Sequence, residues 1–171
     1  MDQKEIISRN LNRVLENIDC ACRKSGRDVK DITLMAVTKM LPVSVAEDIA
    51  SLGVTLIGEN RAGDIEEKFG TGAPAELHMI GHLQRNKVKK IVDTVSCIQS
   101  IDALRTAKAL DLAITQSVQN KGRMPILLEL NTSREASKHG YESADVLLND
   151  IEAYLALENV KIDGLMTMAP F

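Results

Sequence analysis

Short apolar runs alternate with amphipathic segments from residue 33 onward, and this alternation limits the possible folds more than any other feature. The apolar runs predict strands over residues 33–39, 54–58, 76–81, 94–101, 124–130 and 160–168. The amphipathic stretches predict helices over residues 45–52, 61–69, 84–92, 102–119 and 144–157. Because strands that alternate with helices form parallel sheets with right-handed crossovers, the sequence predicts an α/β fold.

Local signals predict where the helices begin and end. An amphipathic helix over residues 2–25 precedes the first strand, and Gly26 is placed to end it. Ser44, Asp102 and Ser143 are expected to cap the helices that follow them, Ser44 in a capping box. Residues 1–171 are expected to form one domain, with helix 2–25 added in front of the repeating unit.

Two architectures fit this pattern, a (β/α)8 barrel and an open doubly wound sheet. Neither a GxGxxG motif after the first strand nor a Walker motif occurs, so a nucleotide-binding open sheet loses support. The barrel needs eight strands, whereas the pattern supplies six strand–helix units, the last without its helix.

Composition narrows the class of protein. The formal net charge is −3 with both signs interspersed, so nucleic acid is not an expected partner, and the basic run 85–90 is interpreted as a solvated helix face. No apolar run reaches the roughly 20 residues that span a bilayer. Three cysteines without a signal peptide indicate reduced thiols in a cytoplasm. The spacings of the cysteines and histidines match no metal motif, so no metal site is expected.

Polar residues lie at or just beyond the carboxyl ends of the predicted strands, and in a parallel barrel these ends meet at one mouth. They include Lys39, Asn60, His82, Ser100 and Asn131, but no close pair of carboxylates. Lys39 follows a run that should be buried on both faces, and burial would lower the pKa of its amine and favour attack on carbonyl groups. The pattern predicts an imine between Lys39 and a sugar-like carbonyl compound or pyridoxal 5′-phosphate, against the alternative of a solvated lysine at a strand end.

Several motifs resemble one family in order along the chain. They are AVTK at 36–39 with Pro42, GEN at 58–60, HMIGHLQRNK at 78–87, Asn131 with SKHG at 137–140, and GLMTMAP at 164–170. Together they are similar to the pyridoxal phosphate homeostasis proteins, single-domain relatives of the alanine racemase N-terminal barrel. The blocks at 78–87 and 164–170 are the most specific.

The resemblance implies a fold and a cofactor site. The fold would be the alanine-racemase-type (β/α)8 TIM barrel with an extra N-terminal helix, here with about six of its units. Lys39 matches the residue that holds pyridoxal 5′-phosphate as an imine. Asn60 matches a residue of the cofactor pocket after the second strand, and Met166 an apolar contact to the pyridine ring. His82 matches a motif histidine near the pocket, and no residue is assigned a catalytic role.

The implied function is binding of pyridoxal phosphate in its intracellular homeostasis, with pyridoxal-phosphate-dependent enzymes as candidate partners. One alternative is a racemase-like enzyme, but neither Tyr141 nor Tyr154 lies at a predicted strand end to act as its second base. Family members are longer, and their last two units bind the cofactor phosphate. The chain is therefore expected to be the N-terminal part of a longer protein, and a complete protein that has lost its last two units is the alternative. A further alternative is a fragment without a working cofactor site. In each case six strands of a barrel leave two open sheet edges, which would favour self-association.

Overall fold

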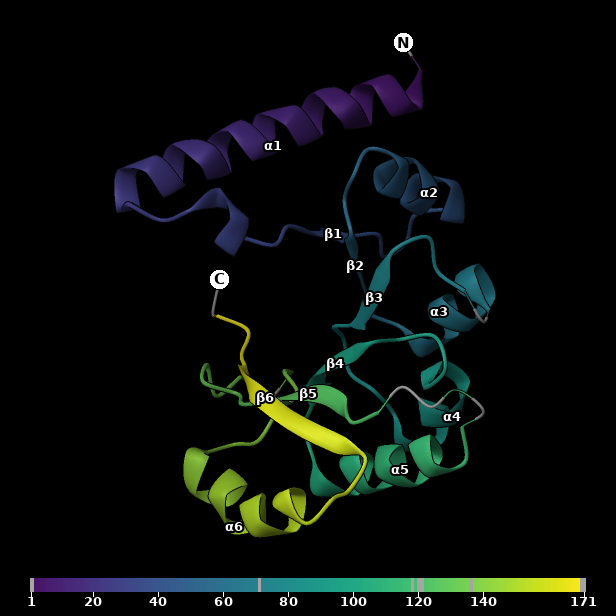
Figure 1. The fold of residues 1–171 in the computed structure, drawn as a ribbon. Coiled ribbons are helices and arrows are strands. Elements are labelled where there is room, and N and C mark those ends of the chain that lie inside the picture. The colour runs from purple at the N-terminus through teal and green to yellow at the C-terminus, as the bar shows by residue number, and fades with distance from the viewer. Residues whose placement is uncertain (1, 71, 118, 120–121, 136, 170–171) are drawn as a thin grey trace.

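The computed structural model describes residues 2–70, 72–117, 119, 122–135 and 137–169. Strands and helices alternate in the predicted order (Figure 1). The strands are β1 Met35–Val37, β2 Leu56–Glu59, β3 Glu76–Met79, β4 Cys97–Ile101, β5 Met124–Glu129 and β6 Val160–Met166. The α-helices are α1 Gln3–Ser25, α2 Val43–Ser51, α3 Ala62–Phe69, α4 Val88–Ile91, α5 Leu104–Thr115 and α6 Ala144–Leu155, and 3-10 turns lie at η1 Val29–Asp31 and η2 Arg85–Lys87.

The six strands form one parallel sheet in the order β1-β2-β3-β4-β5-β6. Among the described residues no ladder joins β1 to β6, so the sheet is not closed and has an edge at each of these strands. Figure 1 shows the sheet curving, with α2 to α6 along its outer side. The predicted α/β class is confirmed, as an open sheet of partial TIM-barrel type.

The hydrophobic core lies between the curved sheet and these outer helices. Alternate strand residues face this layer, since successive side chains of a strand point to opposite faces. Fully buried examples are Ile57 in β2, Met79 in β3, Ile98 in β4 and Ile126 in β5, each with no exposed surface. Leu110 of α5 packs into the same cluster. Each such side chain contributes roughly 1.5–3 kcal/mol by leaving water.

Helix α1 stands apart from this core and packs against α2 and η1 (Figure 1). Its N-terminus is closed by a hydrogen bond from the Asp2 N–H to the Glu5 carboxylate, and its end by Gly26 in the left-handed region at φ 69°. The predicted glycine cap is therefore confirmed. Leu15 on the same helix remains 45% exposed, so α1 buries little of its apolar surface.

Several local predictions are wrong. Strand β1 covers only Met35–Val37 and is half-buried, because an edge strand has one neighbouring strand and α1 leaves its surface open. Helix α2 begins at Val43, so Ser44 lies inside it and Pro42 takes the cap position. Residues 84–92 form a 3-10 turn and a short helix rather than one helix.

The cap predicted at Asp102 is also wrong. Helix α5 begins at Leu104 after Ala103, and Asp102 turns toward His82 instead. The cap at Ser143 is confirmed, since its hydroxyl accepts a hydrogen bond from the Val146 N–H.

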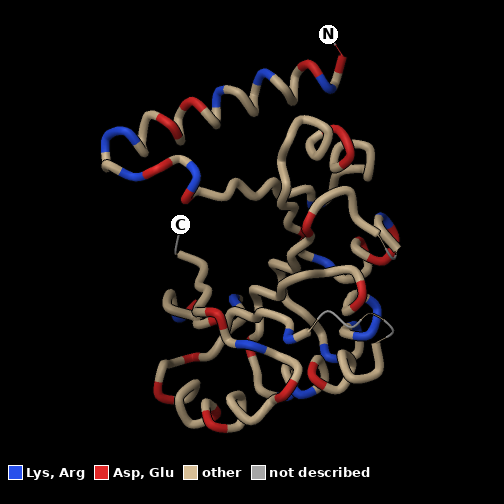
Figure 2. The backbone as a smooth tube through the Cα atoms, viewed as in Figure 1, with Lys and Arg blue, Asp and Glu red and all other residues tan. Residues whose placement is uncertain are grey.

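Acidic and basic residues are spread along the chain and alternate along α1 (Figure 2). In the basic run, Lys90 pairs with Glu66 at 2.6 Å on the surface, while Val88 of the same run is buried. Among the described residues, none of the helices combines the length and the apolar character needed to cross a membrane.

Candidate functional site

A cavity of about 320 Å³ lies at the carboxyl ends of the strands. It is lined by segments that follow β1, β2 and β3, by the ends of β5 and β6, and by the loop before α6. The lining residues are Lys39, Asn60, Ile80, Gly81, His82, Glu129, Ser137, Lys138, His139, Met166 and Met168. Lys39, Asn60 and Met166, the three residues predicted from sequence, therefore meet in one cavity.

Lys39 reaches the cavity from a turn just beyond β1. The turn is tight, because Met40 adopts a left-handed conformation with φ 62°, which is uncommon for a non-glycine residue. Lys39 is exposed, so the expectation of a lysine desolvated by a buried strand is wrong. Within the described chain no hydrogen bond or ion pair occupies its amine, which is therefore open to a ligand.

A buried network fixes the peptide that precedes Lys39. The Thr38 hydroxyl donates to Glu59 Oε1 at 2.8 Å. The Lys68 amine, which reaches across from α3, donates to the same oxygen at 2.8 Å and to the Thr38 carbonyl at 3.1 Å. Glu59 has no exposed surface and its side chain pairs with Lys68, so the network acts as a buried ion pair. Lys68 carries no local sequence signal for this role, because the role depends on how α3 packs against β2.

Asn60 is brought to the cavity by the close approach of two strand ends. A Cβ atom on Gly81 would lie 2.4 Å from the Asn60 carbonyl oxygen, so only glycine fits after β3. The Asn60 Oδ1 atom is buried and has no hydrogen-bond partner in the described residues. An unpaired buried polar atom costs roughly 1–3 kcal/mol, and a bound polar ligand would remove that cost.

The opposite wall carries Glu129 and Met166, which are register partners on β5 and β6. Burial raises the pKa of the Glu129 carboxyl, the Asp102 charge adds to this rise, and His139 opposes it. Met166 is half-buried and gives this wall an apolar surface.

The loop between β5 and α6 completes the cavity. Asn131 shapes this loop by donating to the carbonyls of Glu135 at 2.9 Å and Lys138 at 3.4 Å. The Lys138 amine pairs with Glu135 at 2.9 Å and donates to the Ala169 carbonyl. Asn131 therefore holds the loop in shape, while the neighbouring Lys138 and His139 reach the cavity.

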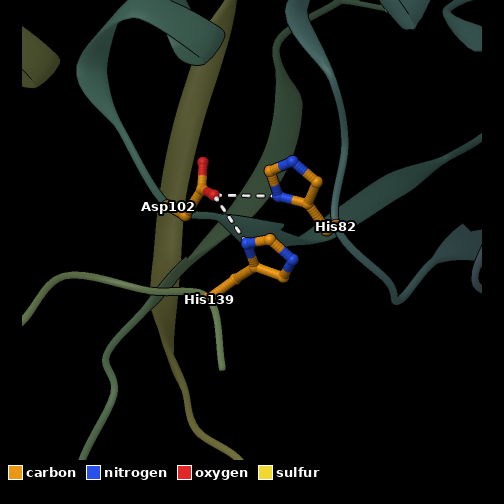
Figure 3. Close-up of side chains that lie close together, drawn as sticks. All are labelled: His82, Asp102 and His139. Atoms are coloured by element: carbon orange, nitrogen blue, oxygen red, sulfur yellow. Dashed lines mark ion pairs between the residues drawn. The ribbon is translucent and has the colours of Figure 1, made fainter. Parts of the chain in front are cut away.

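Three side chains that sequence analysis did not connect form a cluster at the cavity wall (Figure 3). His82 Nδ1 lies 2.9 Å from Asp102 Oδ2, and His139 Nδ1 lies 4.0 Å from the same oxygen. The two imidazole rings are stacked, with centroids 3.8 Å apart and planes 10° from parallel. The three residues are far apart in the sequence, so no local pattern predicts that they meet. They come together only because the strand ends converge.

The two tyrosines face each other away from the cavity lining. Tyr141 donates to Asp150 at 2.8 Å and lies 3.0 Å from the Tyr154 hydroxyl. Burial is the main cause that raises the pKa of both phenols. Both tyrosines are buried, so they act as packed structural residues.

Comparison with known proteins agrees with this architecture. The profile of the family described as alanine racemase, N-terminal domain, matches residues 10–171. The pyridoxal phosphate homeostasis protein of Aquifex aeolicus is 34% identical over 163 residues, which cover 94% of this chain and 70% of the relative. The protein of that name from Haemophilus influenzae is 31% identical over 145 residues, covering 82% and 60%.

Solved structures show the same fold. An unknown protein from Bifidobacterium adolescentis superimposes with a TM-score of 0.83 at 27% identity, over 99% of this chain and 72% of that one. PipY of Synechococcus elongatus, solved with PLP bound, gives a TM-score of 0.70 at 24% identity, over 92% of this chain and 71% of PipY.

The chain belongs to the alanine racemase N-terminal domain family, among the pyridoxal phosphate homeostasis proteins. It spans 70% and 60% of the lengths of the Aquifex and Haemophilus relatives.

Proposed function

We propose that this chain binds pyridoxal 5′-phosphate as a Schiff base on Lys39 and serves intracellular pyridoxal phosphate homeostasis. One observation carries the proposal. Lys39, Asn60 and Met166 come from three separate strand ends and line one cavity. The volume of about 320 Å³ lies in the range of small-molecule sites. The names of the relatives and the structure of PipY with PLP bound support the same cofactor.

The residues fit the chemical groups of this cofactor. The amine of Lys39 is free among the described residues and supplies the nucleophile for its aldehyde. Asn60 offers an unpaired buried oxygen to a donor on the ligand, and Met166 offers an apolar surface to the ring. When bound, the cofactor supplies an electron sink for amine and amino-acid chemistry.

A racemase-like enzyme is the alternative, and the tyrosines argue against it. Racemisation needs a second base on the other face of the substrate. Tyr141 and Tyr154 are buried and hydrogen-bonded to each other, and neither lines the cavity. The proposal is therefore a carrier or homeostasis protein that lacks robust racemase turnover.

Three further features belong to the proposal. A cytoplasmic location is supported by the free thiols of Cys20, Cys22 and Cys97. Pyridoxal-phosphate-dependent enzymes are the proposed recipients of the cofactor. Within the part of the chain that the structure describes, β1 and β6 are edge strands without a second neighbour. This supports self-association, because an open edge presents free backbone donors and acceptors.

Absorbance titration with pyridoxal phosphate tests the assignment. We expect the purified chain to give a band to the red of the free aldehyde at one equivalent, and Lys39→Ala to lose it. Lys138→Ala is the matched control, because this second lysine lines the same cavity and is already paired with Glu135. A folded chain without the band would support a fragment that lacks a working cofactor site. An equal band in Lys39→Ala would contradict the proposal.

A further inference from the structure

We propose that His82, Asp102 and His139 form a binding site for a divalent transition-metal ion of the zinc type. The three side chains come from the ends of β3 and β4 and from the loop before α6 (Figure 3). Each offers one ligand atom, and all three atoms lie within 4.8 Å of one another. The site is additional to the cofactor function, and it borders the same cavity.

The spacing of the ligand atoms suits a tetrahedral ion. Ligand atoms at about 2.0–2.1 Å from zinc lie roughly 3.3–3.4 Å from one another. The distance from Asp102 Oδ2 to His82 Nδ1 is 2.9 Å, and that to His139 Nδ1 is 4.0 Å, so these two contacts bracket the required separation. An ion would draw His139 in and move His82 outward by less than about one ångström.

The rings have room to make this adjustment. In the present arrangement they are stacked at 3.8 Å, whereas a metal lies close to the plane of each imidazole that binds it. The side chains of His82 and His139 are 33% and 54% exposed, so tilting the rings apart displaces little protein. Asp102, only 12% exposed, is the fixed member of the set.

The local charge favours a cation. Asp102 and Glu129 interact through like charge, and this contributes to the raised pKa of Glu129. The Glu129 side chain makes no hydrogen bond or ion pair in the described part of the chain. Two lysines also line the cavity, but the charge of Lys138 is balanced by Glu135. A cation on Asp102 would reduce the repulsion between the two carboxylates.

The ligand types indicate which ion. Imidazole nitrogens suit zinc, cobalt, nickel and copper, whereas magnesium and calcium prefer oxygen ligands throughout. Two imidazoles, one carboxylate and a water from the cavity would complete four-coordinate geometry. The competing interpretation is an ion pair between Asp102 and protonated His82, with no ion bound.

Metal titration of the untagged chain separates the two interpretations. A Cys20→Ser background removes the exposed thiol as a competing ligand. Zinc binding is measured by calorimetry without pyridoxal phosphate, and cobalt binding by the visible absorbance of a four-coordinate ion. We expect one equivalent to bind at neutral pH, more weakly at acidic pH because the imidazoles must be neutral.

Variants locate the ion. His82→Ala, Asp102→Asn and His139→Ala should each weaken zinc affinity at least about tenfold. The control is His78→Ala, since His78 on β3 pairs with Gln99 on β4 and lies outside the cluster. Lys39→Ala should keep metal binding, so failure of the metal site and failure of the cofactor site remain distinguishable. The proposal would be overturned if the three cluster variants bound zinc as tightly as the His78→Ala control, or if the folded parent bound no zinc.

Discussion

Strands β1 and β4 come from similar apolar runs but differ in burial. Four of the five residues of Cys97–Ile101 are buried, whereas Met35–Val37 has none and Val37 is 46% exposed. The strand β4 has a neighbour on each side and helices over its outer face, while β1 is an edge strand with α1 standing off. Position in the sheet, rather than composition of the run, decides burial.

The two edge strands also border the candidate site. Lys39 follows the edge strand β1, and Met166 ends the other edge strand, β6. The central strands are buried, whereas the edges bring the exposed amine of Lys39 and the half-buried side chain of Met166 to the cavity. A buried network of Thr38, Glu59 and Lys68, rather than apolar contact, holds the end of β1 in place.

Removing Lys68 should give the largest effect. Lys68→Met leaves the fully buried Glu59 without its cation, and we expect a loss of about 3–5 kcal/mol in the free energy of unfolding. Urea denaturation provides the measurement. Lys90→Met is the control, because its partner Glu66 is exposed and the loss should stay below about 1 kcal/mol. Equal losses would show that the network does not hold β1.

Truncating apolar side chains tests the contrast in burial directly. Ile98→Ala in β4 should cost about 2–5 kcal/mol, because the side chain is fully buried in the core. Val37→Ala in β1 should cost no more than about 0.5 kcal/mol, as expected for an exposed position. Similar values from urea denaturation would mean that the edge of β1 is covered in solution, for instance by a second copy.

A smaller loss of stability is expected at the pair of Tyr141 and Tyr154. Tyr141→Phe removes the hydroxyl that contacts Asp150 and Tyr154, and we expect a loss of about 1–2 kcal/mol in unfolding free energy. Binding of pyridoxal phosphate should be unchanged. A variant of normal stability that no longer binds the cofactor would contradict the structural role given to these tyrosines.

The smallest expected effect concerns Glu129. The pKa of Glu129 is raised in the folded state, so the folded protein holds the proton more tightly than the unfolded chain. The stability that protonated Glu129 contributes is therefore full below the unfolded pKa and is lost as the pH rises through the folded pKa. At acidic pH, Glu129→Gln and the parent should have similar thermal stability. As the pH rises from 5 to 8, the variant should become slightly more stable than the parent. A difference that does not change with pH in thermal melts would refute this.

Much of the fold could be predicted because periodicity is local. The parallel sheet followed from alternation, and its sequential strand order agrees with the barrel that the family resemblance implied. Lys39, Asn60 and Met166 line one cavity because parallel strand ends converge. Tertiary partners explain the misses. Asp102 pairs with His82 instead of capping α5, and the ion pair of Lys68 with Glu59 links α3 to β2. Neither partner is visible in a local pattern.

Borohydride trapping tests the central claim most directly. The chain is incubated with one equivalent of pyridoxal phosphate, reduced, digested, and mapped by peptide mass. The account predicts a single modified peptide containing Lys39, with the peptide containing Lys138 unmodified. Modification centred on Lys138, or scattered over the surface lysines with Lys39 unmodified, would contradict it.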